Sequence, residues 1–185
     1  KGVAAASMLH AFMNAAGRLS LGIQSMLIGT AWDIRAIDAA DGRCLVHPSG
    51  AVLALYARHH GSQVLAFTGA VDTYAQPVRM GQLEPAPAVA LVDVLVTRSE
   101  DRVLLHLINR DQDQEHRLRL DAGAVAAGEA AIIHRLSGEL DDGPLREAGL
   151  ETWAQTQAVL RPQADGTWRV PVQAACVQII ALPRR

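Results

Sequence analysis

Three residues have the side-chain types of a catalytic site, namely Asp93, His106 and Arg117. A carboxylate next to an imidazole orients the ring and stabilises its charged form in many enzymes. The hairpin register that pairs aliphatic residues on one face of a sheet places all three in one row on the opposite face. No nucleophile accompanies them, and opposite charges across strands commonly stabilise a solvated sheet face by about 0.2–1 kcal/mol. We therefore favour a structural role for this row, with a small unrelated enzyme as an alternative.

Gln24 and Trp32 are candidates for a binding site. Gln24 interrupts the apolar run LGIQSMLIG at 21–29, and an amide in such a run is costly to bury unless hydrogen bonds satisfy it. Either neighbouring backbone satisfies it inside a core, or it faces a site. Trp32 follows in a polar segment, where it either stacks on a sugar ring or covers the helices. The residues alone leave both alternatives open at both positions.

The histidines and cysteines have no metal-binding or nucleophile motif. The seven histidines include no H-E-x-x-H, and the adjacent His59 and His60 project about 100° apart on a helix, so they cannot chelate one ion together. Cys44 and Cys176 lie far apart without C-x-x-C spacing, so we expect two buried thiols. We predict no metal site and no cofactor.

Charge and hydropathy exclude two classes of partner. The 185-residue chain has 17 Lys and Arg against 19 Asp and Glu, a net charge of −2, so we expect no nucleic-acid partner. No apolar run approaches the roughly 20 residues that span a bilayer, so we expect no membrane partner. The missing secretory signal favours a cytoplasmic over a secreted protein. The opening Lys-Gly-Val already has the pattern of a mid-helix, so we expect sequence to precede it.

The pattern over residues 1–60 is helix, strand, helix. Apolar residues at i, i+3 and i+4 spacing predict an amphipathic helix over 3–16. The apolar run at 21–29 fits a buried strand better than a helix, and 32–44 is polar and irregular. A second periodic stretch over 48–61 begins with proline and ends with glycine, as helices commonly do.

Residues 61–185 change to a period of two, which predicts strands. A proline-rich connection covers 77–87, and turns at 98–101 and 110–113 define two hairpins. The interior pairs are Val96 with Val103, Val94 with Leu105, Val92 with Leu107, Leu105 with Leu118 and Val103 with Leu120. The further predicted strands are 62–70, 130–136, 153–160, 167–172 and 175–182. Seven or more short strands at this spacing indicate a β-sandwich.

Several motifs together resemble one family. They are A-A-x-x-L-H-A-x-M-N at 5–14, I-Q-S-M-L-I at 23–28 and H-P-S-G-x-V-x-x-L-Y-x-x-H-H-G at 47–61. The second half adds L-I-N-R-D at 107–111 and a terminal strand ending at Ala181-Leu182. In this order and spacing the chain resembles the C-terminal third of an α-L-arabinofuranosidase of glycoside hydrolase family 51, and the resemblance covers essentially the whole chain.

The resemblance implies a mainly β fold with an N-terminal α/β segment. Residues 1–60 are then the last helix, strand and helix of a (β/α)8 barrel, and 61–185 form an antiparallel, jelly-roll-like β-sandwich. The implied activity is retaining hydrolysis of terminal α-L-arabinofuranosyl residues from arabinose-containing polysaccharides by two glutamates. In that family both glutamates lie upstream of the helix that begins this chain, so we expect the chain alone to be inactive and mainly structural.

The resemblance also implies a substrate residue and partners. Gln24 matches the glutamine of the last barrel strand, which lines the arabinose subsite, whereas Leu27 departs from the family's asparagine. The expected partners are the upstream catalytic barrel of the same protein and an arabinose-containing oligosaccharide. We also expect a homo-oligomer, because a partial barrel leaves an apolar face uncovered.

The alternative to this assignment is a free-standing carbohydrate-binding or interaction module. Only 4% of the residues are aromatic, which leaves few platforms for sugar rings. Exposure of Trp153 and Trp168 on one face favours this alternative, whereas burial of both weighs against it.

Overall fold

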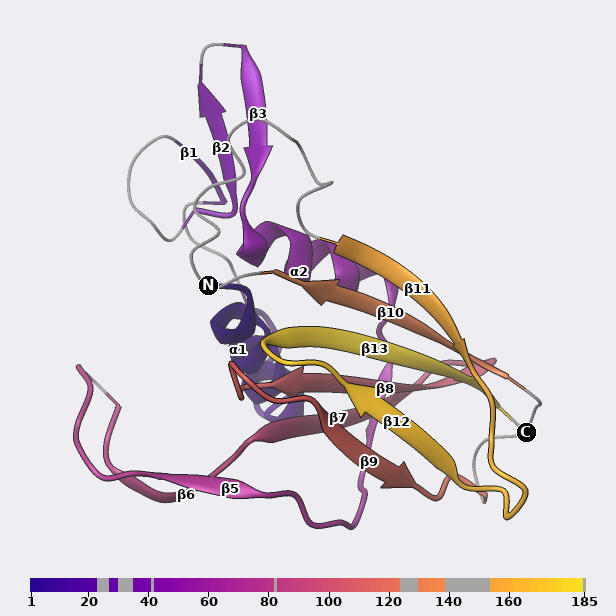
Figure 1. Ribbon diagram of the computed structural model, residues 1–185. Coiled ribbons are helices and arrows are strands. Elements are labelled where there is room, and N and C mark those ends of the chain that lie inside the picture. The colour runs from indigo at the N-terminus through magenta and orange to yellow at the C-terminus, as the bar shows by residue number, and fades with distance from the viewer. Residues whose placement is uncertain are drawn as a thin grey trace.

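The computed structural model shown in Figure 1 describes residues 1–22, 27–29, 35–40, 42–81, 83–123, 130–138 and 154–184. Helix α1 (Gly2–Asn14) lies where the apolar periodicity predicts a helix. Helix α2 (Pro48–Arg58) begins at a proline, whose missing N–H has no partner in a first helical turn anyway. Both predicted helices are therefore confirmed.

A small sheet lies between the two helices in the sequence. Strand β1 (Ile28–Gly29) pairs in parallel with β2 (Ile37–Ala40), which forms an antiparallel hairpin with β3 (Arg43–Val46). This hairpin projects from the body of the molecule (Figure 1). The prediction of irregular structure over 32–44 is thus wrong for the hairpin, where Gly42 has a φ of +72°. Glycine adopts this left-handed conformation without a Cβ clash, which permits the tight turn.

The predicted buried strand over 21–29 is wrong for its described residues. Only Ile28 and Gly29 are in a strand, Leu21 is 69% exposed, and Leu27 and Ile28 are exposed as well. An apolar strand is buried only where other elements cover its faces, and no described element covers these side chains. Residues 23–26 lie outside the described residues.

The body of the molecule is a six-stranded antiparallel sheet in the order β11-β10-β13-β8-β7-β4. The strands are β4 (Gln63–Leu65), β7 (Val92–Arg98), β8 (Arg102–Asn109), β10 (Ala131–Ser137), β11 (Ala154–Leu160) and β13 (Cys176–Pro183). Two further pairs are β9 (His116–Leu120) with β12 (Trp168–Val172) and β5 (Thr73–Gln76) with β6 (Ala86–Ala90). The β5–β6 ribbon extends away from the sheet (Figure 1). The strands predicted in the last third of the chain are confirmed.

The register of the first hairpin differs from the predicted one by two residues. Val96 pairs with Leu105 and Val94 pairs with Leu107. The loop is Ser99–Arg102, where the Ser99 N–H donates to the Arg102 carbonyl at 2.9 Å. Because side chains alternate with a period of two, a shift of two residues keeps every side chain on its predicted face.

The second predicted hairpin is wrong. Strand β9 does not pair with β8 but with β12, where Leu118 lies opposite Val170. The free edge of β8 is taken by β13, and Leu105 pairs with Ile180 there. Strand β13 is buried at every residue from Cys176 to Leu182, so it requires a central place in the sheet with both faces covered.

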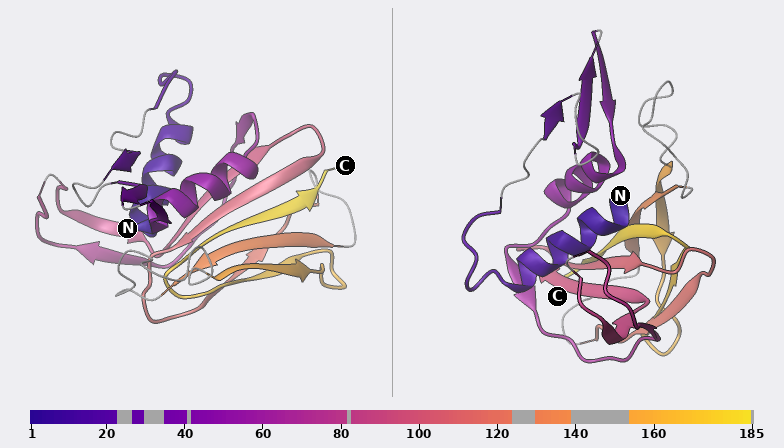
Figure 2. Two further views of the ribbon diagram at one scale, coloured as in Figure 1. Left: turned by 90° about the horizontal axis from the view of Figure 1, so that it is seen from above. Right: turned by 90° about the vertical axis from the view of Figure 1, so that its left-hand side faces the viewer.

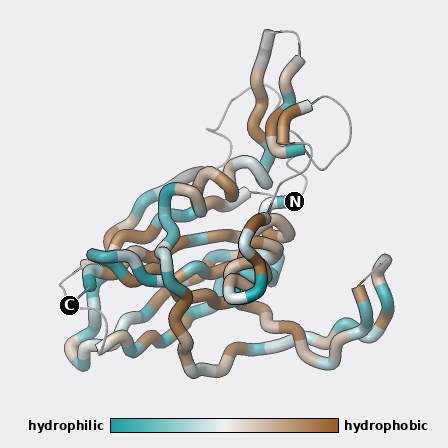
Figure 3. The backbone as a smooth tube through the Cα atoms, turned by 180° about the vertical axis from the view of Figure 1, so that it is seen from behind, coloured by the Kyte–Doolittle hydropathy of each residue, from teal (hydrophilic) through white to brown (hydrophobic). Residues whose placement is uncertain are grey.

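The central sheet is covered on both faces, which gives three layers (Figure 2). On one face, Val96, Leu105 and Ile180 pack against the β9–β12 ribbon, including Trp168. On the other face, Leu104, Ile108 and Ile179 pack against α1 and α2. In Figure 3 the strands of this sheet contain long apolar stretches. The structure confirms a mainly β, sandwich-like fold that follows N-terminal helices.

Residues from both predicted domains share the second core. Ala6, Leu55 and Tyr56 from the N-terminal helices pack there against the sheet. The chain crosses from α2 to the sheet at Gly61, where an added Cβ would lie 2.3 Å from the Arg98 carbonyl oxygen. Glycine is thus required for this close approach. The boundary between residues 60 and 61 stays a prediction.

Candidate functional site

The predicted row of Asp93, His106 and Arg117 does not form. Asp93 on β7 and His106 on β8 face the helices, whereas Arg117 on β9 belongs to the other layer. The Arg117 side chain is 82% exposed and pairs with Glu115 at 3.0 Å. The prediction fails because β9 pairs with β12 instead of β8. The face that carries Asp93 and His106 is also not solvated, since α1 and α2 cover it.

Asp93 instead belongs to a polar network that joins α1 to the sheet. Its Oδ1 lies 3.3 Å from His10 Nδ1, and its Oδ2 accepts a hydrogen bond from Arg110 Nη2 at 2.5 Å. The same Arg110 nitrogen donates to the Ser7 hydroxyl at 3.2 Å, and Arg110 Nη1 donates to the Ala90 carbonyl at 3.0 Å. One arginine thus holds a side chain of α1, a side chain of β7 and the backbone of β6.

A second part of this network joins α2 to the sheet. The Tyr56 hydroxyl lies 2.7 Å from His10 Nε2, and the Tyr56 ring packs 5.0 Å from the His106 ring between centroids. His106 Nε2 is 2.9 Å from the Thr97 hydroxyl, which also accepts the Gly61 N–H at 3.0 Å. The Tyr56 hydroxyl of α2 therefore finds its partner on α1, while the Tyr56 ring packs against the sheet.

The order Asp93, His10, Tyr56 is that of a proton relay, but the pKa shifts of Asp93 and Tyr56 argue against one. Burial raises the pKa of Tyr56, and the Asp93 charge raises it further, so the phenol stays neutral. Burial also raises the pKa of Asp93, but His10 and then Arg110 outweigh it and lower that pKa below its usual value. Burial lowers the pKa of His106 to about 3, with smaller contributions from His10 and other histidines. These fixed charge states suit a structural joint between the helices and the sheet.

Sequence reasoning missed His10, Tyr56 and Arg110 as members of this joint. A signal was present for His10, which lies four residues after Ala6 on the apolar face of α1 and is buried with it. No local signal marks Arg110, because its partners lie 17 and 103 residues away in the sequence.

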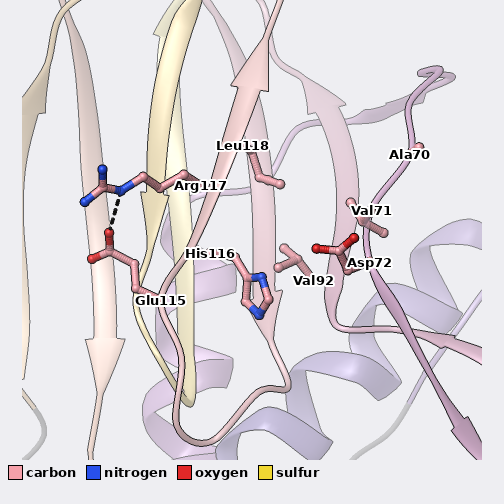
Figure 4. A pocket seen from close by; sticks show the side chains of 8 residues that line it. All are labelled: Ala70, Val71, Asp72, Val92, Glu115, His116, Arg117 and Leu118. Carbon is pink, nitrogen blue, oxygen red and sulfur yellow. Dashed lines mark hydrogen bonds and ion pairs between the residues drawn. The ribbon is translucent and has the colours of Figure 1, made fainter.

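An open cleft of about 600 Å³ lies on the opposite side of the sheet, between residues 70–72 and strand β9. Figure 4 shows the side chains of Asp72 and His116 beside Val92, which comes from the sheet. His116 Nε2 lies 3.1 Å from Asp111 Oδ2. The Glu115–Arg117 pair lies apart from them in the same view. The lining of the cleft thus divides equally between apolar side chains and polar or charged ones.

Several other predictions depend on where aromatic and cysteine residues lie. Gln24, Trp32 and Trp153 fall outside the described residues, so their predicted roles remain predictions. Trp168 is buried in the core under the ribbon, which weighs against a sugar platform there. Cys176 is buried as predicted, but Cys44 is exposed, because its strand lies in the projecting hairpin.

Within the described ranges, no three His, Cys, Asp or Glu residues gather in a geometry that could hold a metal ion. No helix in those ranges is long and apolar enough to cross a membrane.

The outer side of the N-terminal segment exposes large apolar side chains. Met8 is 59% exposed, and Phe12, Leu19, Leu21, Leu27 and Ile28 are exposed as well. We call these six residues the N-terminal apolar surface. Exposed large apolar side chains in such number commonly mark an interface when they form one patch.

The chain matches no protein-family model and no curated protein. Its fold matches solved structures. The α-L-arabinofuranosidase of glycoside hydrolase family 51 from Thermotoga petrophila has a TM-score of 0.83 and 14% identity, over 98% of this chain and 37% of that one. The family 51 enzyme from Bifidobacterium longum has a TM-score of 0.70 and 20% identity, over 98% of this chain and 34% of that one. The chain thus spans about a third of the enzymes that it matches.

A second kind of glycosidase has a similar fold. A family 30 endoxylanase from Clostridium papyrosolvens has a TM-score of 0.60 and 10% identity, over 98% of this chain and 38% of that one. At these identities the likeness concerns the fold alone. It confirms the resemblance of the fold to the C-terminal part of family 51 arabinofuranosidases over nearly the whole chain.

Proposed function

We propose that this chain works as the C-terminal portion of a retaining glycoside hydrolase of the α-L-arabinofuranosidase type. The observation that carries the proposal is the match of 98% of the chain to about a third of such an enzyme, at a TM-score of 0.83. In this proposal the role of the chain is structural. The helices supply the last elements of a catalytic barrel, and the sheet anchors them through the Asp93–Arg110 joint.

The N-terminal apolar surface supports an upstream catalytic barrel as the partner. Met8 and Phe12 on α1 and Leu21 beyond it leave a large apolar area in water, and covering such area is favourable by about 25 cal/mol per Å². A second copy of the chain is the competing occupant. We favour the barrel because α1 and α2 are the elements that the resemblance assigns to it.

The described glutamates do not provide a catalytic pair. Glu84, Glu100 and Glu115 are all exposed, and two of them pair with surface arginines at 3.4 and 3.0 Å. Retaining hydrolysis requires two carboxyl groups about 5–5.5 Å apart across the sugar. In our proposal the upstream barrel supplies both, and the isolated chain is inactive.

The proposed substrate is a terminal α-L-arabinofuranosyl residue of an arabinose-containing polysaccharide. Gln24 and Trp32 are the proposed substrate-binding residues of this chain, on the family motif at 23–28 and on the polar segment that follows. The likeness to an endoxylanase means that the fold does not select the sugar, so the substrate needs its own test.

The test compares hydrolysis of 4-nitrophenyl α-L-arabinofuranoside by the 185-residue chain and by the same chain with its encoded upstream sequence. We expect activity only in the longer protein. Within it, Gln24→Ala should lower kcat/KM at least tenfold, because a site that hydrogen-bonds a substrate hydroxyl loses that bond. Gln112→Ala, at an exposed loop glutamine, is the matched control and should change nothing. Activity in the short chain would overturn the proposal.

A further inference from the structure

The cleft of Figure 4 exists because the second layer of the sandwich is narrow. Among the described strands, β9 and β12 are the two that cover this face of the six-stranded sheet. Beside them, residues 67–72 form a coil over β7. The cleft of about 600 Å³ opens between this coil and β9, and a deeper cavity of about 290 Å³ continues from it. Both share Val71, Val92 and Leu118 as walls. The combined volume lies within the range of small-molecule sites.

Phe67 gives this cleft an exposed aromatic wall. Its side chain lines the deeper cavity yet is 52% exposed, although the apolar core lies directly beneath. An exposed aromatic ring in the lining of an apolar cavity offers an apolar surface to a ligand. The C–H face of a sugar ring is a natural partner, because it is apolar whereas the sugar edge is polar.

Asp72 supplies the polar side of the cleft. Its backbone carbonyl accepts the Leu91 N–H at 2.9 Å, which fixes the residue in place. Its carboxylate has no hydrogen-bond or ion-pair partner among the described residues, and in Figure 4 it lies near Val92 and His116. Two acceptor oxygens on a fixed residue can take hydrogen bonds from neighbouring hydroxyls.

His116 lies across the cleft from Asp72. Its Nε2 is taken by Asp111, so within the described part of the chain Nδ1 is left for a ligand. At the rim Glu115 pairs with Arg117, and Asp111 lies 3.1 Å from His116 Nε2. The Asp72 carboxylate adds a negative charge that has no cationic partner among the described residues. This balance disfavours an anionic ligand, and one aromatic ring is too few for a cage around an organic cation.

We propose that this cleft is a binding site for a neutral saccharide, separate from any site in a catalytic barrel. Phe67 and Leu118 contact the apolar face of the sugar, and Asp72 and His116 bind its hydroxyl groups. The site lies on the opposite face of the sheet from the helices. It therefore holds a saccharide chain at a distance from the reaction that the proposed function assigns to the barrel.

The experiment titrates the 185-residue chain by calorimetry with α-1,5-linked arabinotriose, β-1,4-linked xylotriose and trigalacturonate, each up to about 10 mM. The choice of arabinotriose rests on the proposed function. Xylotriose distinguishes a failure of the proposed arabinose substrate from a failure of the cleft as a saccharide site. We expect at least one neutral trisaccharide to bind and the anionic trisaccharide not to bind. Binding of xylotriose alone supports the cleft while it counts against an arabinose substrate.

Four variants locate the site. Asp72→Asn and Phe67→Ala should each weaken binding about tenfold or more. Asp113→Asn and Phe12→Ala change the same residue types at exposed positions outside the cleft and should bind like the unchanged chain. Unfolding curves check that each variant folds. The proposal is overturned if no neutral trisaccharide binds, if trigalacturonate binds equally well, or if the two cleft variants bind like their controls.

Discussion

The two faces of the central sheet are built on different principles. The face under the β9–β12 ribbon is packed almost entirely with aliphatic side chains such as Leu105 and Ile180. The face under the helices combines apolar residues with polar ones. The half-buried Asp93 lies beside His10 of α1, and His106 bonds to Thr97 within the sheet while its ring packs against Tyr56 of α2. The first face resembles an ordinary sandwich core, and the second resembles an interface between units.

This difference indicates that one face mainly stabilises the fold, whereas the other also fixes the orientation of the helices on the sheet. Aliphatic packing stabilises without fixing one angle between elements, because volume and patterning matter more than individual contacts. Hydrogen-bonded networks with one arrangement specify geometry. The helices, which the proposed function assigns to a barrel, are held by the second kind of contact. The ribbon is held by the first.

The largest effect that separates the two faces should come from a mutation that opens a cavity in the core under the ribbon. Leu107 is fully buried in the aliphatic core, and Leu107→Ala should lower the free energy of unfolding by about 2–5 kcal/mol. Urea unfolding measures this change. The control is Val159→Ala at an exposed position on β11, which should stay within about 0.5 kcal/mol. Equal losses in both variants would show that this face is not a packed core.

A pH dependence should come from the helix face. The pKa of His106 is about 3 in the folded chain against about 6.5 when unfolded. Between these values the unfolded chain binds a proton that the folded chain does not. Stability should therefore fall as the pH drops from about 6.5 towards 3, by up to about 1.4 kcal/mol per pH unit. The lowered pKa values of His59 and His134, caused first by burial, act in the same direction.

Two variants test the origin of this slope in unfolding experiments from pH 7 to pH 4. His106→Gln retains a partner for Thr97 but removes the proton uptake, so the slope should flatten. His60→Gln, at an exposed histidine that lowers the His106 pKa less than burial does, should largely keep the slope. An unchanged slope in His106→Gln would show that His106 is not the source of the pH dependence.

A smaller effect should appear in a double-mutant cycle of Asp93→Ala and Arg110→Ala. These side chains are mostly shielded and lie in contact, so a coupling energy of about 0.5–3 kcal/mol is expected. The exposed pair Arg79 and Glu84, at 3.4 Å, is the matched control and should show coupling close to zero. Similar coupling in both pairs would contradict a specific joint at Asp93.

The smallest perturbation is chemical labelling of the two thiols. Burial raises the pKa of Cys176 to about 11, and its strand is central in the sheet, so it should not react with a disulfide reagent in the folded chain. Exposed Cys44 should react fully. Mass spectrometry after labelling measures both sites, and fast labelling of Cys176 would show that the sheet opens.

Local sequence patterns predicted the elements but not the connections between them. The helix beginning at Pro48 and the strand ending at Leu182 follow from periodicity over neighbouring residues. The pairing of β8 with β13 instead of β9 depends on residues some 70 positions apart, where several apolar strands compete for one edge. The aliphatic pattern of β9 fits pairing with β8 as well as pairing with β12, so the pattern alone could not predict which strand pairs with β9.

The candidate sites were even less accessible from sequence. The joint uses Ser7, His10, Asp93 and Arg110, whose meeting depends on the tertiary fold. The cleft depends on a coil over β7 that was predicted as part of a strand over 62–70. Gln24 and Trp32 rest on the resemblance and on local pattern, so their test is functional.

The central claim is that the outer side of the N-terminal segment is covered by a larger unit, whereas the central sheet already has both of its faces covered within this chain. Hydrogen–deuterium exchange on the 185-residue chain, with and without its encoded upstream sequence, tests this most directly. We predict that amides of residues 2–22 exchange much more slowly in the longer protein, while β8 and β13 exchange equally slowly in both. Equal protection of residues 2–22 in the two proteins would contradict the claim.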